Sequence, residues 1–174
     1  CISMWGQTFR PAYNQLSCLK QWFPDVPILA TTGTATDVVE KDRCQRLNLI
    51  STFVISTSAN RKNLSYFVYE KTEPEIDICS DMEHESTIVY CLTRKETDKI
   101  SEMLEKRGYK CLSYHAGLSN EERKDVQNKF MNGETTCIVA TISFGMGIDK
   151  SNIRKIIHYG CPRDIESYLQ ETGR

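Results

Sequence analysis

Short apolar runs alternate along the chain with amphipathic stretches. The runs are too short to be typical helices and are rich in β-branched and aromatic residues, so they predict buried strands. We place these strands at residues 26–30, 52–56, 64–69, 87–91, 111–114, 136–140 and 155–159.

The stretches between the apolar runs carry the signals of helix ends. Thr36 or Asp37 is suited to cap a helix, Gly108 is suited to end one, and Ser119 with Glu122 has the spacing of a capping box. The first predicted helix runs from Thr36 or Asp37 to residue 47, and two others run over 95–107 and 120–131. A short helix or a loop is predicted at 74–82, and a last helix starts at Asp164.

The alternation of buried strands with helices predicts an α/β protein with a parallel sheet covered on both faces. Residues 56–63 are polar and have no periodicity, and we place a linker there. Ligands of an open parallel sheet bind at the carboxyl ends of its strands, so candidate functional residues are expected there.

Polar and cationic residues follow three of the predicted strands. They are found at 93–95, 115–117 and 141–150. Hydroxyls, a histidine and cations on one sheet edge would suit a phosphate backbone. Each residue also has a purely structural interpretation: Thr93 as a helix cap, His115 as a buried and hydrogen-bonded histidine, and Lys95 as part of a solvated face.

Composition narrows the class of protein. Of the 174 residues, 40% are hydrophobic and 26% are charged, which is typical of a globular protein, and the net charge of −1 weighs mildly against non-specific electrostatic binding of nucleic acid. A local basic patch stays compatible with that charge. No apolar run is long enough to cross a bilayer, so we expect no membrane partner.

The eight cysteines include no CxxC pair, so we expect reduced thiols in an intracellular protein and no metal site. Gly145 and Gly147 form a GxG pair that lacks the third glycine of a dinucleotide fingerprint. The sequence also contains no GxxxxGK[ST] loop and no acidic metal-binding motif, and so no evident means of holding ATP phosphates and magnesium by itself.

Five segments together resemble the motifs of the RecQ family of DNA helicases, which belong to helicase superfamily 2. Residues 1–13 resemble the aromatic-rich loop of the family and 31–36 its third motif; 90–95 resemble the fourth motif, 138–150 the fifth and 167–174 the sixth. The segment 114–118, Tyr-His-Ala-Gly-Leu, also fits the family. The segments come in the order and at the spacings of the family.

The resemblance implies an ATP-dependent 3′-5′ DNA helicase that unwinds duplex DNA in replication, recombination or repair. It implies that residues 1–57 are the C-terminal part of a first RecA-like lobe and that 58–174 are a second lobe, truncated at the sixth motif. We expect ATP and Mg²⁺ as cofactors, bound mainly by a part of the first lobe upstream of Cys1. The expected partners are single-stranded and duplex DNA, and the expected location is nuclear in a eukaryote and otherwise cytoplasmic.

The resemblance also implies roles for single residues. The ATP-facing residues would be Gly147, Asp149, Gln170 and Arg174. The residues that hold the translocated strand would be Thr93, Arg94, His115, Gly117 and Thr141, and those that touch single-stranded DNA from the aromatic loop would be Trp5, Phe9 and Arg10. No complete catalytic set is expected within these 174 residues.

Gln7 and Thr8 depart from the family, in which a His-Asp pair is usual at that point of the aromatic loop. This departure bears on the coupling of DNA contact to ATP hydrolysis, not on the fold. Two other functions stay open at this point: a nucleic-acid-binding module without chemistry, and an RNA helicase of the same superfamily.

Overall fold

The computed structural model describes residues 12, 15–33, 36–58, 60–79, 82, 85–145, 148 and 150–174, with the backbone alone at 75 and 76. The chain divides into two compact units, Cys1–Ser65 and Tyr66–Arg174. The boundary expected between residues 57 and 58 lies eight residues before this division, which falls just after the predicted linker at 56–63. The assignment of the two units to two motor lobes stays a prediction.

The described part of the first unit contains two helices, α1 (Cys18–Trp22) and α2 (Asp37–Arg46). The side chain of Thr36 accepts a hydrogen bond from Val39 N–H, so Thr36 is the cap of α2. The strands predicted at 26–30 and 52–56 are wrong: these residues form no strand, and Leu29 and Phe53 are 88% and 85% exposed. An apolar run becomes a strand only when a neighbouring strand pairs with it.

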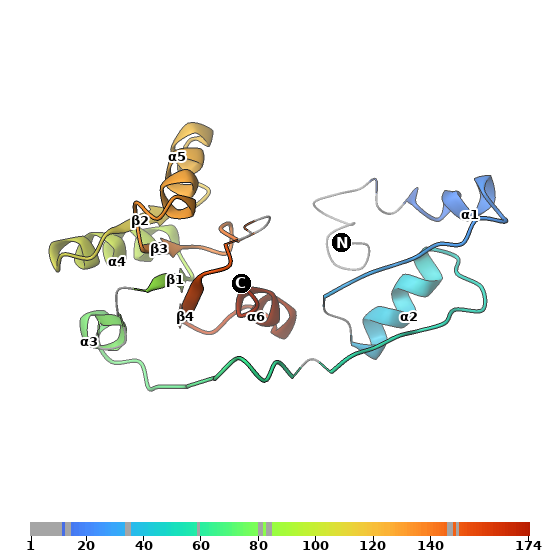
Figure 1. The fold of residues 1–174 in the computed structure, drawn as a ribbon, viewed down its shortest axis with the longest axis horizontal. Helices are drawn as coiled ribbons and strands as arrows, with labels where there is room; N and C mark the ends of the chain where they lie inside the picture. Colours follow the sequence, from blue (N-terminus) through green and yellow to red (C-terminus); the bar gives the residue numbers. More distant parts are fainter. Residues whose placement is uncertain are drawn as a thin grey trace. The chain divides into compact units, whose positions relative to one another are not determined.

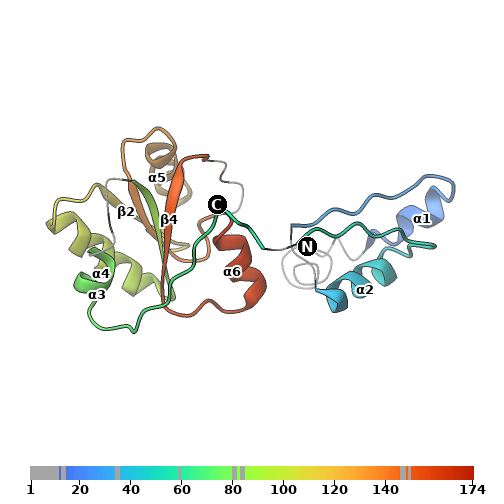
Figure 2. The ribbon, with the colours of Figure 1, turned by 60° about the horizontal axis from the view of Figure 1, so that its bottom comes forward.

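The second unit contains a sheet of four parallel strands: β1 (Ser86–Cys91), β2 (Cys111–Tyr114), β3 (Cys137–Ala140) and β4 (Ile153–Tyr159). Their spatial order is β2-β3-β1-β4, so β2 and β4 are the edges among the described strands (Figure 2). These strands match four predicted runs, and the predicted α/β class is confirmed. The strand predicted at 64–69 is not formed.

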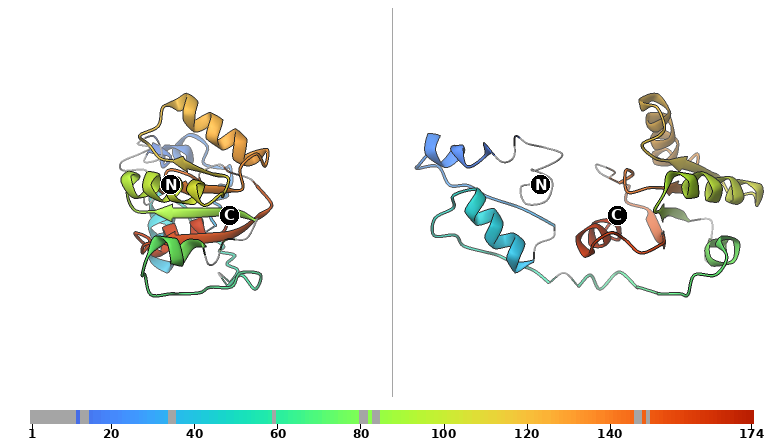
Figure 3. Two further views of the ribbon diagram at one scale, coloured as in Figure 1. Left: turned by 90° about the vertical axis from the view of Figure 1, so that its left-hand side faces the viewer. Right: turned by 180° about the vertical axis from the view of Figure 1, so that it is seen from behind.

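Helices cover both faces of this sheet (Figures 1 and 3). They are α3 (Pro74–Cys79), α4 (Arg94–Lys106), α5 (Asn120–Met131) and α6 (Ile165–Glu171). Ile100 and Leu104 of α4 pack with Val89 and Val139 on one face. On the other face, Phe130 of α5 packs in a separate cluster built on alternate residues of the same strands. The alternation of side chains along each strand therefore supplies both cores.

The predicted helix ends are present in this unit. Ser119 and Glu122 form the capping box of α5, and Asp164 caps α6 by accepting a hydrogen bond from Ser167 N–H. Gly108 follows α4 with a φ of +86°, in the left-handed region that glycine adopts without strain. These ends fix where each helix begins relative to the strand before it, and so they position the residues at the sheet edge.

Candidate nucleic-acid and nucleotide site

The candidate site lies at the carboxyl ends of β1, β2 and β3, where the sequence places its polar loops. Because the strands are parallel and in register, Tyr90, Tyr114 and Ala140 lie side by side near these ends. Thr141 N–H donates to Tyr114 O over 3.1 Å, which ties the loop after β3 to the end of β2. The loops after these strands are therefore brought to one edge.

Thr93 and Arg94 lie at the first turn of α4. The Thr93 hydroxyl oxygen accepts a hydrogen bond from Glu96 N–H at 3.1 Å, so Thr93 is the helix cap that its structural interpretation predicted. A hydroxyl that accepts one bond still has its own proton to donate. Thr93 and Arg94 are both exposed, so a capping role and a phosphate contact are compatible at this position.

His115 is 6% exposed, and both of its ring nitrogens are engaged within the chain. Gly117 N–H donates to Nδ1 over 3.1 Å, and Nε2 lies 2.9 Å from Asp98 Oδ1. Since Nδ1 accepts, the proton of the neutral ring is on Nε2 and is donated to Asp98. In this arrangement His115 has no ring nitrogen left for a phosphate, and it holds the loop that follows β2.

Gly117 lies against this ring and beside Arg94. A Cβ at Gly117 would lie 2.9 Å from His115 Nδ1 and 3.5 Å from Arg94 Cδ. Any side chain here would have to displace the imidazole. The structure thus brings Arg94, His115 and Gly117 together from α4 and the loop after β2, and Arg94 is the exposed cation of this group. We call these residues, with Thr93 and Asp98, the edge cluster.

Thr141 lies on the neighbouring loop, and its hydroxyl is 2.8 Å from that of Ser143. Either oxygen can be the donor in that pair, so one hydroxyl proton remains available. Ser143 therefore shares the local hydrogen bonding of a predicted DNA-contacting residue.

Arg174, which follows α6, forms the centre of a second group of residues and contacts the same loop at Gly145. Its Nη1 donates to Gly145 O, and a Cβ at Gly145 would lie 2.7 Å from Nη2 and 2.9 Å from Tyr90 Oη. Gly145 has a φ of +132°, so both its conformation and its surroundings exclude a side chain. Arg174 Nε is buried and has no hydrogen-bond partner among the described residues.

Tyr90 and the pair His158–Glu171 complete this group, which we call the arginine cluster. Tyr90 Oη donates to Phe144 O over 3.1 Å, and burial raises the pKa of Tyr90 to about 12. His158 Nε2 lies 2.8 Å from Glu171 Oε2, with side-chain exposures of 13% and 9%. The ring of His158 stacks on that of Tyr90 with centroids 5.4 Å apart. These contacts fix α6, which carries the sixth motif, against β1 and β4.

Five members of these clusters were not predicted as site residues: Asp98, Tyr90, Gly145, His158 and Glu171. Each acts through a contact that is distant in sequence, and only Asp98 and His158 lie outside the segments that the motifs single out. No local spacing could have identified Asp98 as the partner of His115.

The remaining predicted residues are placed only in part. Gln170 is exposed near the end of α6. Trp5, Phe9, Arg10, Gly147 and Asp149 lie outside the described residues, so their predicted roles stay predictions. Within the described ranges, no group of three or more His, Cys, Asp or Glu side chains is arranged to hold a metal ion. Nor does that part of the chain contain a helix both long and apolar enough to cross a membrane.

Known proteins resemble this chain along its whole length. The model of the helicase conserved C-terminal domain family matches residues 68–174. The chain therefore belongs to this helicase family. The resemblance to RecQ helicases is also confirmed: the ATP-dependent DNA helicase RecQ of Pasteurella multocida is 44% identical over all of the chain, and the helicase SGS1 of Saccharomyces cerevisiae is 40% identical.

These relatives are much longer than the chain, which spans 28% of the P. multocida protein and 12% of SGS1. A protein of Acanthamoeba polyphaga mimivirus that is named as an ATP-dependent RNA helicase, R290, is also 44% identical over the whole chain and is covered to 32%. Among solved structures, S. cerevisiae Dbp5 bound to RNA and ADP BeF3 matches 99% of the chain with a TM-score of 0.76 and 17% identity, and 47% of that chain is covered. At this identity the match shows the helicase fold alone.

Proposed function

We infer that this chain is the nucleic-acid-facing and nucleotide-facing part of an ATP-dependent 3′-5′ DNA helicase. In this proposal, residues 1–57 end the first RecA-like lobe and 58–174 form most of the second. The observation that carries the proposal is the edge cluster, in which an exposed Arg94 lies beside Gly117 at the carboxyl edge of the sheet. The 44% identity to a RecQ helicase supports the assignment of the motor type.

Arg94 would bind a phosphate of the translocated strand, with the hydroxyls of Thr93 and Thr141 as further donors. A guanidinium binds a phosphate oxygen pair in a fixed geometry and carries no base information, which suits a motor that moves along any sequence. His115 would act as a positioning residue, since both ring nitrogens are engaged with Asp98 and Gly117. Trp5, Phe9 and Arg10 would add base stacking and a further cation from the aromatic loop.

The arginine cluster would face ATP. The unpartnered Nε of Arg174 fits a phosphate, because a buried guanidinium nitrogen without an acceptor is costly until an anion supplies one. Gln170, Gly147 and Asp149 would lie at the same nucleotide. ATP hydrolysis supplies the free energy of the motor when the nucleotide is bound, and Mg²⁺ would be held mainly by residues outside this chain.

Strand displacement by the full-length helicase tests this proposal. The substrates are a DNA duplex and an RNA duplex of the same sequence, each with a single-stranded overhang at either end. We expect ATP-dependent unwinding of the DNA duplex from the 3′ overhang. Preferential unwinding of the RNA duplex would favour the RNA helicase interpretation, to which the similarity with R290 also points. ATP-independent binding without unwinding would leave a nucleic-acid-binding module.

A further inference from the structure

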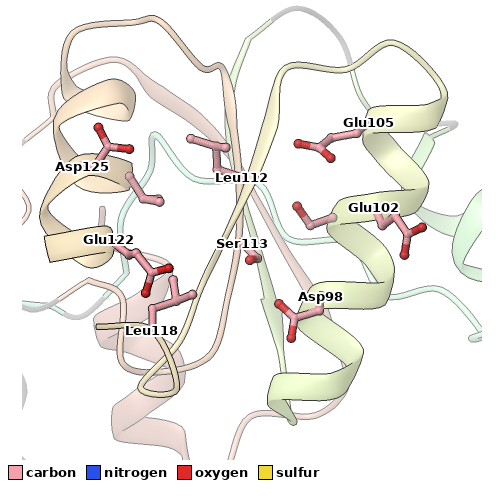
Figure 4. Close-up of a pocket in the computed structure, with 10 residues that line it drawn as sticks. Asp98, Glu102, Glu105, Leu112, Ser113, Leu118, Glu122 and Asp125 are labelled. Carbon is pink, nitrogen blue, oxygen red and sulfur yellow. The ribbon is translucent and has the colours of Figure 1, made fainter. Parts of the chain in front are cut away.

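The outer edge of the sheet carries a groove that shares only Asp98 with the edge cluster. Strand β2 forms its floor, α4 forms one wall and α5 forms the other (Figure 4). The groove has a volume of about 410 Å³, and a second hollow of about 320 Å³ that shares Glu105 and Leu112 continues it along the same strand. This space therefore follows the length of β2 along its open side.

The backbone of β2 has hydrogen-bonding groups that point into this groove. Lys110 O accepts from Cys137 N–H, and Tyr114 O accepts from Thr141 N–H, both toward the β3 side. Backbone groups of successive strand residues point to opposite sides, so the N–H and C=O groups of Cys111 and Ser113 point away from β3. Cys111 is 2% exposed, so Ser113 is the residue of this pair that the groove leaves accessible. No strand among the described residues pairs with β2 on that side. An unpaired edge of this kind is a template for one further strand.

Acidic side chains line the walls of the groove. On α4 they are Asp98, Glu102 and Glu105, and on α5 they are Glu122 and Asp125. Asp98 and Glu105 from one wall and Glu122 from the other point toward the space above β2 (Figure 4). Lys110 and Lys129 line the second hollow. Two cations beside the walls form exposed i,i+4 pairs, Lys106 with Glu102 and Lys129 with Asp125, each at 2.7 Å. Such exposed pairs are weak and can be exchanged for an incoming cation.

We propose that this groove docks an extended, lysine- or arginine-containing segment of a partner protein, which adds to the sheet as a strand beside β2. The backbone of the segment would pair with Ser113, and its basic side chains would reach the carboxylates on the two walls. The same carboxylates repel a nucleic-acid backbone, and they also repel the identical acidic walls of a second copy of this chain. The charge of the groove therefore favours a basic polypeptide over a nucleic acid and over a second copy of this chain.

Peptide binding to the full 174-residue chain tests this proposal. The probe is a fluorescein-labelled octapeptide of alternating Lys and Val, and the readout is fluorescence anisotropy. One comparison peptide carries Glu in place of Lys, and another carries N-methyl groups on the backbone nitrogens that would pair with β2. We expect saturable binding of the basic peptide and about tenfold weaker binding of each comparison peptide, the loss that one or two hydrogen bonds or ion pairs account for.

Two pairs of variants locate the binding on the chain. Ser113→Pro removes one outward N–H at an edge position where proline is tolerated, and Ser113→Ala keeps that N–H. We expect about tenfold weaker binding for Ser113→Pro and less than about twofold change for Ser113→Ala. Glu105→Lys reverses a charge in the groove, whereas Glu121→Lys makes the same change at an exposed position of α5 outside its lining. Only Glu105→Lys should weaken binding.

Several results would overturn the proposal. Equal binding of the N-methylated peptide would show charge attraction without strand addition, and this result does not depend on whether Ser113→Pro folds. No saturable binding of the basic peptide would also overturn it. Displacement of the peptide by Ca²⁺ at equal charge concentration, but not by Na⁺, would indicate a cation site. Dimers in sedimentation that disappear in Ser113→Pro would indicate that a second copy of the chain occupies the edge.

Discussion

The edge cluster and the arginine cluster lie at the same carboxyl edge of one sheet, yet they differ in exposure. In the edge cluster, Arg94 is exposed, and the carboxylate partner of His115 is also exposed, since the Asp98 side chain is 56% exposed. In the arginine cluster, the carboxylate partner of His158 is buried, since the Glu171 side chain is 9% exposed. Arg174 donates a hydrogen bond to the backbone carbonyl of Gly145. An exposed guanidinium suits a contact that is made and broken along a strand, whereas the half-buried Arg174 is held in place by its hydrogen bond to the backbone.

The largest expected effect concerns turnover. The chain should hydrolyse no ATP above background, with or without single-stranded DNA, because the sequence has no GxxxxGK[ST] loop and the arginine cluster would supply only one phosphate-binding cation. Phosphate release assays on the purified chain measure this. DNA-stimulated release that scales with the polypeptide through a further purification step would show that the cluster is catalytically complete.

The two histidine pairs should differ in their contribution to stability. His158→Ala leaves Glu171 buried without its partner, so we expect a loss of about 3 kcal/mol in the free energy of unfolding. His115→Ala leaves the carboxylate of the half-exposed Asp98 in water and costs about 1 kcal/mol, mainly from the unpaired Gly117 N–H. Urea unfolding of both variants measures the difference. Equal losses would mean that the exposure of the carboxylate does not decide the cost.

Substitution of Gly145 in the arginine cluster should lower the free energy of unfolding more than substitution of Gly117 in the edge cluster. Gly145→Ala places a Cβ 2.7 Å from Arg174 Nη2 at a φ of +132°, and we expect a loss of about 2 kcal/mol. Gly117→Ala places a Cβ 2.9 Å from His115 Nδ1, where a small rotation of the ring relieves the contact, and we expect about 1 kcal/mol. Thermal unfolding of the two variants, measured side by side, shows which substitution destabilises the protein more. A more damaging Gly117→Ala would place the tighter packing in the edge cluster.

A smaller effect is expected in the pH dependence of the free energy of unfolding. Tyr90 has a folded-state pKa of about 12, raised by burial from 10.0, so the unfolded chain loses this proton first. The contribution of Tyr90 to stability is therefore complete below pH 10 and is lost as the pH rises from 10 to 12. Tyr90→Phe should flatten the decline in unfolding free energy over that range, which urea unfolding at a series of pH values measures. The same slope in both proteins would contradict the burial of the Tyr90 hydroxyl.

The sequence predicts the second unit far better than the first. Runs at 87–91, 111–114, 136–140 and 155–159 became strands because each has a neighbour in the same unit. The equally apolar runs at 26–30 and 52–56 did not, since an apolar run specifies burial and not the partner that makes it a strand. Caps such as Ser119 are local in sequence, and they were predicted correctly.

Prediction of the candidate site from the sequence has the same limit: local patterns do not identify contacts that are distant along the chain. Motif order predicts which loops meet at the sheet edge, because parallel topology brings their ends together. It does not predict the direction in which a side chain points. His115 turns both nitrogens inward to Asp98 and Gly117, and Arg174 turns onto Gly145, through contacts between residues up to 29 positions apart.

The central claim is that Arg94 is the exposed phosphate contact of the edge cluster. Its most direct test is the salt dependence of oligo-dT binding by the full-length helicase and by its Arg94→Ala variant, with Lys99→Ala as a control that removes an exposed cation from a later turn of α4. We expect Arg94→Ala to bind about tenfold more weakly on every sequence, with a slope of log affinity against log salt shallower by about 0.7, and Lys99→Ala to match the wild type. An unchanged salt slope in Arg94→Ala, or an equal change in Lys99→Ala, would contradict the account.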